Sequence, residues 1–340
     1  MPLKGRERPS KWSVVKSIVL VRRNELEIAD FVAEPAVQPG EVKIRMLAGG
    51  VCGSDLSVVH GNRTIPSYPW IIGHEGGGVV VDVAADVDQL SPGDRVIVEP
   101  NIACMKCPWC LRGETKMCAN RVILGINSPG LFSEYITIPA RFAWKVPAET
   151  PKRVLESLEP SVVAHVAVQR YLGGDYRNTL VVGAGSQGLI VATLLADAGM
   201  APAVSEPNLE KLATAIAHGA HAMDAGERYD LVFEASGSPA GLQLAIDRAE
   251  KLGTLCVIGQ TNRPTEIVSQ TIVQKELKIN GQLIYNHPAD FRSAISSIAD
   301  HTLDPTIALR APVGPAQGVL DILSAADLGG KIWIDFENWG

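Results

Sequence analysis

The chain has 340 residues, of which 46% are hydrophobic and 20% charged, and its formal net charge at pH 7 is −6. This length allows two domains with substantial cores, and the acidic balance excludes an extended nucleic-acid surface, which needs a basic face. No apolar run reaches the roughly 20 residues of a membrane-spanning helix. The basic N-terminal segment lacks the apolar centre of a secretory signal, so the sequence predicts a cytoplasmic protein that acts on a small molecule.

The N-terminal half is predicted to be rich in strands. Residues 1–14 are expected to form an extended tail, and residues 14–147 contain short strand-like runs, such as SIVLVR and DRVIVEP, separated by glycine and proline. This pattern predicts a small open barrel. Within it, Cys52 in GGVCGSDLS and His74 in IIGHEGGG are residue types that bind a catalytic metal, and the neighbouring glycines favour exposure at turns. Taken alone, a cysteine is more often a core residue, and a histidine more often has a structural role.

Residues 101–120 hold four cysteines in the pattern Cys-x2-Cys-x2-Cys-x7-Cys: Cys104, Cys107, Cys110 and Cys118. A disulfide knot is disfavoured in the reducing cytosol, and a redox Cys-x-x-Cys pair normally opens a helix of a thioredoxin-like unit, which is missing from the surrounding sequence. Four thiolates at this spacing close a tetrahedron around Zn²⁺ and leave no open position. The pattern therefore predicts a structural zinc site. An iron–sulfur cluster is the alternative, because it also takes four cysteines.

The next distinctive feature is a glycine-rich turn. A β-branched run, Leu180 to Val182, leads into G-x-G-x-x-G spacing, and an apolar helical periodicity follows. The three glycines of the motif are Gly183, Gly185 and Gly188. Between a strand and a helix, this spacing predicts a dinucleotide-binding turn whose helix N-terminus faces the pyrophosphate. The next strand ends at Glu206, where a carboxylate can accept the ribose hydroxyls of NAD and repel the extra phosphate of NADP. A solvated strand end is the alternative for Glu206.

Alternating strands and helices continue beyond the glycine turn. Strands are predicted at 230–236, 253–260 and 277–285, with a helix over 241–251, so residues from about 160 to 288 are expected to form a doubly wound parallel sheet. Glu159, in SLEPSVV just before this region, is a third candidate metal ligand. From residue 289 the sequence predicts a helix and then a strand, KIWIDF, that returns to the first domain. The first predicted domain comprises residues 1–157 and 289–340, and the second comprises residues 158–288.

Several short motifs occur in one order along nearly the whole chain: GVCGSD, GHEGGG, SPGDRV, the four-cysteine segment, LEP and GAGSQG. Together they resemble the zinc-dependent medium-chain alcohol dehydrogenases. The resemblance implies an α/β protein with a GroES-like β-rich catalytic domain, a Rossmann NAD-binding domain, an active site in the cleft between them, and a homodimer or homotetramer. It also implies reversible oxidation of a secondary alcohol (a polyol, cyclitol or amino alcohol) to a ketone. An NADPH-dependent aldehyde or ketone reductase and a non-catalytic NAD-binding relative are the alternatives.

The resemblance also implies roles for individual residues. It implies three ligands of the catalytic zinc: Cys52, His74 and Glu159. A glutamate in the third place resembles the polyol branch, which includes sorbitol and threonine dehydrogenases. Glu75 matches a carboxylate that either enters the coordination sphere or steadies the site electrostatically, and Ser54 matches the hydroxyl that takes the proton of the substrate. One position departs, because Ser57 stands where the family often has a proton-relaying histidine, and His60 is interpreted as a bystander.

Overall fold

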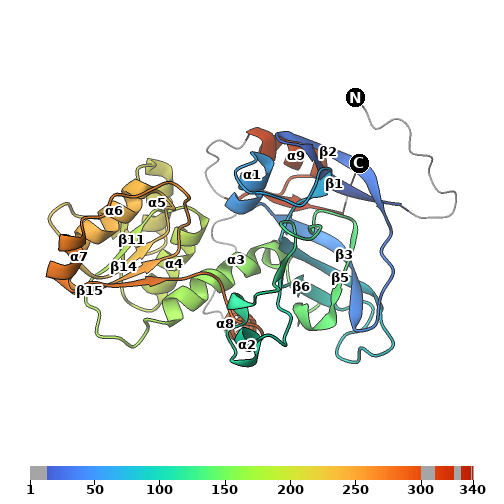
Figure 1. Ribbon diagram of the computed structural model, residues 1–340, viewed down its shortest axis with the longest axis horizontal. Coiled ribbons are helices and arrows are strands. Elements are labelled where there is room, and N and C mark those ends of the chain that lie inside the picture. Colours follow the sequence, from blue (N-terminus) through green and yellow to red (C-terminus); the bar gives the residue numbers. More distant parts are fainter. Residues whose placement is uncertain (1–13, 300–310, 325–330, 338, 340) are drawn as a thin grey trace.

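A computed structural model describes residues 14–299, 311–324, 331–337 and 339 of the chain. These residues form a β-rich body and an α/β body, which lie side by side (Figure 1). The predicted tail falls outside the described residues except for Val14, and parts of the predicted 289–340 segment fall outside them as well. Among the described residues, no helix has both the length and the apolar character needed to cross a membrane.

Among the described residues, the β-rich body contains a small antiparallel sheet of β7 (Asn101–Ile102) and β8 (Val122–Ile123) and two larger antiparallel sheets. In one, β1 (Val14–Arg22) lies between β2 (Glu25–Ala33) and β4 (Trp70–Ile71). The other has the order β10-β6-β5-β3-β17, with β9 also paired to β3; the bounds are β3 (Glu41–Gly50), β5 (Glu75–Val83), β6 (Arg95–Val98), β9 (Tyr135–Pro139), β10 (Ala143–Val146) and β17 (Trp333–Asp335). The C-terminal strand therefore returns to the first body, next to β3.

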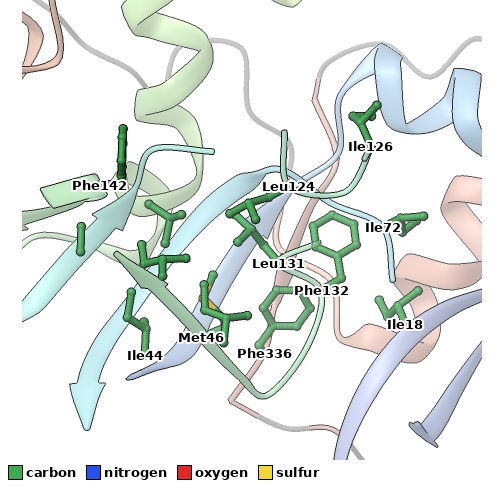
Figure 2. Close-up of a cluster of buried hydrophobic side chains, with 14 of the residues drawn as sticks. Ile18, Ile44, Met46, Ile72, Leu124, Ile126, Leu131, Phe132, Phe142 and Phe336 are labelled. Atoms are coloured by element: carbon green, nitrogen blue, oxygen red, sulfur yellow. The ribbon is translucent and has the colours of Figure 1, made fainter. Parts of the chain in front are cut away.

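The core of the β-rich body lies between these sheets and positions the turn that carries His74. Phe132 and Phe336 pack with their ring centroids 5.6 Å apart, beside Met46 (Figure 2). Gly73 has a φ of +92°, and a Cβ at this position would lie 2.2 Å from the ring of Phe132. Only glycine fits this combination of left-handed backbone and close approach. The packed aromatic core thus fixes the backbone immediately before His74.

The α/β body is built on one parallel sheet of six described strands in the order β13-β12-β11-β14-β15-β16. The strands are β11 (Thr179–Val182), β12 (Ala203–Ser205), β13 (His221–Ala222), β14 (Tyr229–Glu234), β15 (Ala249–Val257) and β16 (Lys278–Gly281). The helices are α4 (Ser186–Asp197), α5 (Leu209–Ala217), α6 (Pro239–Arg248) and α7 (Ser269–Lys275). The order reverses between β11 and β14, which is where such folds bind dinucleotides. The predicted doubly wound parallel sheet is confirmed.

Some predicted boundaries in this body are wrong; the strand expected over 277–285, for example, is β16 and ends at Gly281. Residues 249–251 were expected in a helix, but they begin β15, and Ala249 pairs with Tyr229 of β14. Ala249 and Tyr229 are both almost completely buried, so packing in the sheet outweighs the helical propensity of the segment. Leu252 then has a φ of +63°, which interrupts the regular strand before its second, longer pairing with β14.

A long helix, α3 (Lys152–Gln169), lies between the two bodies and packs against both (Figure 1). It contacts β3 and β5 of the β-rich body and α4 of the α/β body. The sequence reading did not predict α3, and its interior proline, Pro160, normally argues against a continuous helix. The remaining elements are α1 (Gly53–Val59), β7 (Asn101–Ile102), α2 (Pro108–Leu111), a 3-10 turn (Thr115–Met117), β8 (Val122–Ile123), a 3-10 turn (Ala140–Phe142), α8 (Ala289–Ala299) and α9 (Pro315–Ser324).

Candidate active site

A cavity of about 1520 Å³ is lined by residues of both bodies. The β-rich body contributes Cys52, His74 and Glu75, helix α3 contributes Glu159, and the glycine turn contributes residues 184–187. The candidate metal ligands and the candidate dinucleotide turn therefore share one cavity. A ligand bound at the metal would face a cofactor bound at the turn.

Asp55 positions two of the candidate ligands. It is the third residue of α1, and its Oδ2 accepts a hydrogen bond of 2.9 Å from the backbone N–H of Cys52, the N-cap residue. Its Oδ1 lies 2.9 Å from Nδ1 of His74, and the carboxylate is fully buried. A carboxylate on Nδ1 leaves Nε2 to bind a metal. The sequence reading missed Asp55, although the Cys-x-x-Asp spacing matches a capping box, which signals this arrangement.

The structure brings Cys52, His74 and Glu75 together. One ligand atom from each lies within 4.8 Å of the others, the spacing expected around a single ion. Glu159 lies outside this group of three but lines the same cavity, where its Oε1 accepts a hydrogen bond of 2.7 Å from the hydroxyl of Tyr285. Glu75, rather than Glu159, is thus the carboxylate that lies with Cys52 and His74, although the sequence predicted Glu159 as the third ligand. The role of each carboxylate as a ligand stays a prediction.

The electrostatics of this group suit a cation. Burial, followed by the charge of Glu75, raises the pKa of Glu159 to about 7. Burial lowers the pKa of His74, but Asp55 and Cys52 outweigh this effect and raise it well above its ordinary value. The contributions of Glu75 to the first shift and of Asp55 and Cys52 to the second indicate that acidic groups are concentrated here. A divalent cation bound by a thiolate, an imidazole and a carboxylate would neutralise that charge, and zinc takes these donors.

A buried lysine lies behind the metal group. Nζ of Lys331 forms an ion pair with Oε2 of Glu75, and both side chains are almost completely buried. Glu156, on α3, is fully buried nearby, and neither of its carboxylate oxygens has a hydrogen-bond partner in the described part of the chain. Burial raises the pKa of Glu156, while the charge of Lys331 lowers it. Lys331 therefore compensates two buried carboxylates, and the sequence reading identified neither Lys331 nor Glu156.

The four cysteines of the predicted structural site converge in a separate lobe, as free thiols. One sulfur from each lies within 4.8 Å of the others, and Cys107 and Cys110 have their sulfurs 3.5 Å apart. The backbone N–H groups of Cys110 and Ala119 lower the pKa of Cys107 to about 6, which favours the thiolate that binds metal. This donor set matches a closed tetrahedral zinc site.

The glycine turn has the geometry that a dinucleotide requires. Gly183 has a φ of +92°, and a Cβ on Gly188 would lie 1.9 Å from the carbonyl oxygen of Gly183. By contrast, a Cβ on Gly185 would meet no atom within 4 Å, so this position opens toward the cavity and leaves room for a phosphate. Glu206 accepts hydrogen bonds from the backbone N–H groups of Ala184 (2.7 Å) and Asn208 (3.0 Å). Its predicted contact with the ribose stays a prediction.

Two hydroxyls from α1 line the cavity near the metal group. Oγ of Ser54 lies 3.1 Å from Nε2 of His74. Ser57 is on the same wall, and its Oγ donates a 3.0 Å hydrogen bond to the carbonyl of Gly53. His60 does not belong to the described lining of the cavity; its Nδ1 is 2.8 Å from Oδ1 of Asn24. This placement supports the interpretation of His60 as a bystander.

Comparisons with known proteins agree with this arrangement. Residues 38–148 match the alcohol dehydrogenase GroES-like domain, and residues 188–300 match the zinc-binding dehydrogenase family. The starvation-sensing protein RspB of Escherichia coli is 30% identical over 281 residues, covering 78% of this chain and 82% of that protein. Galactitol 1-phosphate 5-dehydrogenase of E. coli is 29% identical over 344 residues, covering 94% and 99%.

Solved structures show the same fold. The crystal structure of rspB from E. coli CFT073 complexed with NADH superimposes with a TM-score of 0.86 at 26% identity, covering 95% of this chain and 100% of that one. The two matched domains, the gathered metal donors and the cofactor turn lead to one conclusion. The chain belongs to the zinc-dependent medium-chain alcohol dehydrogenase family and is an oxidoreductase that uses zinc and a nicotinamide cofactor.

Proposed function

We propose that this protein oxidises a secondary hydroxyl of a polyol to a ketone, reversibly, with NAD as the hydride acceptor. The observation that carries the proposal is the group of Cys52, His74 and Glu75, whose ligand atoms lie within 4.8 Å of one another on the wall that also holds the glycine turn. We further propose that Glu159 joins this site as a ligand or as an acceptor next to the metal. The same cavity can therefore hold the alcohol and the nicotinamide together.

The residues around the cavity have separate tasks. When bound, zinc supplies a Lewis acid that lowers the pKa of the substrate hydroxyl, and NAD supplies the hydride acceptor. Ser54 is the hydroxyl placed to accept the proton of the substrate, because it lies beside His74 on the cavity wall. Ser57, further along α1, lines the cavity where the family often has histidine. We propose that the proton leaves through water at this side, because a serine hydroxyl does not hold it near neutral pH.

We propose NAD rather than NADP as the preferred cofactor. Glu206 directly follows β12, and its carboxylate accepts a hydrogen bond from the backbone of the turn at Ala184. Its negative charge is therefore held at the end of this strand, where the adenosine ribose is expected. A carboxylate there disfavours the additional phosphate of NADP. Comparison of kcat/KM for NAD and NADP at limiting concentration tests this preference, and equal values for the two cofactors would contradict it.

We propose that the protein is cytoplasmic and forms a homodimer or homotetramer. In the described part of the chain, β16 ends the parallel sheet and pairs only with β15. Val268, Val273 and Ile279 are exposed around this edge. An open strand edge with apolar side chains nearby supports association through this face. Light scattering after size-exclusion chromatography measures the oligomeric state, and a monomer at micromolar concentration would contradict the proposal.

Replacement of one metal donor tests the catalytic proposal. Cys52→Ser is expected to abolish NAD reduction with a panel of polyols and to lower the zinc content by one ion per chain, while NAD binding is retained. Cys256→Ala is the matched control, because Cys256 is a buried cysteine of β15 outside the cavity lining, and it should keep both zinc and turnover. Wild-type turnover in Cys52→Ser would show that this thiol does not belong to the reaction centre.

A further inference from the structure

Three arginines line the cavity that contains the metal group, and two of them, Arg63 and Arg121, belong to the β-rich body. The third, Arg263, follows β15 in the α/β body and is exposed. Arg63 follows α1, the helix that carries Ser54, and Arg121 follows Cys118 of the four-cysteine lobe. Both side chains are partly buried. The sequence reading assigned a role to neither of them, because they are 58 residues apart and belong to no motif.

Neither arginine uses its guanidinium group in a salt bridge with the described residues. Among the described residues, no carboxylate lies within 4.0 Å of either one. Arg121 donates to the backbone carbonyl of Lys116, which fixes its orientation. Burial lowers the pKa of Arg121, and the charges of Tyr285 and Cys118 partly offset this effect. The positive charge of Arg63 makes a smaller contribution that lowers the pKa. Two cations are therefore held near each other in a chain whose net charge is −6.

The pair belongs to the part of the cavity that remains for the substrate. Arg121 lies close enough to Tyr285 for the two groups to interact electrostatically, and the hydroxyl of Tyr285 donates to Glu159 beside the metal group. The pyrophosphate of the cofactor is expected at the glycine turn, which belongs to the α/β body. Arg63 and Arg121 both come from the β-rich body, which also supplies Cys52, His74 and Glu75.

We propose that Arg63 and Arg121 bind an oxyanion on the substrate, so that the substrate is an anionic polyol that carries a phosphate or a carboxylate. This inference rests on the proposed function, to which it adds the charge of the substrate. The planar fork of arginine matches both oxyanions and can form two parallel hydrogen bonds with either. Two parts of the cavity then bind the substrate: the acidic metal group binds its reacting hydroxyl, and the arginine pair binds its charged end.

Matched pairs of substrates test the proposal and separate the two oxyanions. Galactitol 1-phosphate is compared with galactitol, and L-idonate with L-iditol, with NAD and zinc-loaded protein. The anionic member of at least one pair is expected to have the higher kcat/KM, and the pair that shows the larger ratio identifies phosphate or carboxylate. A hydrogen bond between charged groups contributes enough that its loss lowers kcat/KM by about 10- to 100-fold.

Arg63→Gln is the variant of choice, because Arg121 also supports the cysteine lobe. This variant is expected to lose about 10- to 100-fold in kcat/KM for the anionic substrate, mainly through KM, and to leave the neutral polyol and the KM for NAD unchanged. Arg63→Lys should recover part of the loss, since it retains the charge. Arg141→Gln, which removes an exposed arginine outside the cavity lining, should behave as the wild type.

The outcomes separate this inference from the proposed function. Equal kcat/KM for charged and neutral members, or a raised KM for NAD in Arg63→Gln, would overturn the inference while the dehydrogenase function stands. If no alcohol reduces NAD, the proposed function fails, and inorganic phosphate then becomes the probe. In about 10 mM phosphate, a rise in Tm of the wild type that is absent in Arg63→Gln supports the anion site. The same rise in both proteins, or no rise in either, overturns the inference.

Discussion

Lys331 is expected to stabilise the catalytic body because it is the positive charge that accompanies two buried carboxylates. It forms an ion pair with Glu75 and influences Glu156, whose oxygens have no hydrogen-bond partner among the described residues. Lys331→Met keeps much of the side-chain volume and removes the charge. Breaking a buried ion pair by removing one partner typically costs about 3–5 kcal/mol, since the other charge stays buried without compensation.

This free-energy change corresponds to a measurable shift in Tm. A chain of 340 residues has an unfolding entropy of about 0.7 kcal/mol per kelvin. A loss of about 3–5 kcal/mol therefore lowers Tm by about 4–7 °C, measured by calorimetry on zinc-loaded protein at pH 8.

The effect of Lys331→Met should depend on pH. Burial raises the pKa of Glu156 above its ordinary value of 4.5. A carboxyl with a raised pKa favours the folded state below its unfolded pKa, and this contribution is lost as the pH rises through the folded pKa. The carboxyl group of Glu156 is more fully ionised at high pH, where the charge of Lys331 compensates it. The decrease in Tm caused by Lys331→Met should therefore be larger at pH 8 than at pH 5.

A double variant isolates the carboxylate. Glu156→Gln removes the charge that Lys331→Met leaves uncompensated, so the double variant should regain part of the lost Tm, and the two substitutions should not be additive. Lys145→Met removes an exposed lysine that pairs with Asp94 at the surface and should change Tm by only about 1 °C. A Lys331→Met protein as stable as this control, or a double variant no more stable than Lys331→Met alone, would refute the reasoning.

Three further predictions concern the cofactor turn and the two metal sites. Gly188→Ala places a methyl group against the carbonyl oxygen of Gly183, and NAD affinity measured by fluorescence titration should fall by at least about tenfold. Cys107→Ser removes the thiol with the lowered pKa, so zinc content should fall by one ion per chain and Tm should drop, while the second zinc remains. Because the metal-free pKa of His74 is raised and a bound imidazole must be neutral, zinc measured after dialysis should decrease from pH 8 to pH 5.

The regular elements were predictable where local pattern and tertiary packing agree. The strand, glycine turn and helix around Gly183 are consecutive in the sequence, and the parallel sheet follows from the repetition of strands and helices. Helix α3 was missed because Pro160 lies inside it, and because a helix that packs on two bodies is buried on most sides and has no simple polar face. At 249–251 the sheet outweighs the local preference, because Ala249 is fully buried beside Tyr229.

The residues of the site likewise divide into those that local motifs identify and those whose role depends on tertiary contacts. Cys52 and His74 stand in short glycine-rich motifs, so the sequence identified them as candidates. Lys331 and Glu156 belong to no motif, and their significance depends on a contact made between distant segments, which a single sequence does not reveal. Asp55 is intermediate, since its capping position is a local signal even though its second contact, with His74, is tertiary.

Helix α3 is the element that relates the metal group to the cofactor turn. Its residue Glu159 lies on the cavity beside the metal group, and the carbonyl of the next residue, Pro160, accepts a hydrogen bond of 2.8 Å from Nε2 of Gln187 in the glycine turn. Two adjacent residues of one helix thus connect the cavity wall beside the metal group with the glycine turn. Hydride transfer requires the alcohol carbon and the nicotinamide to be held in a narrow range of distance and orientation. A helix packed on both bodies supplies that constraint more precisely than a loop would, because its own geometry sets the spacing between the two contacts.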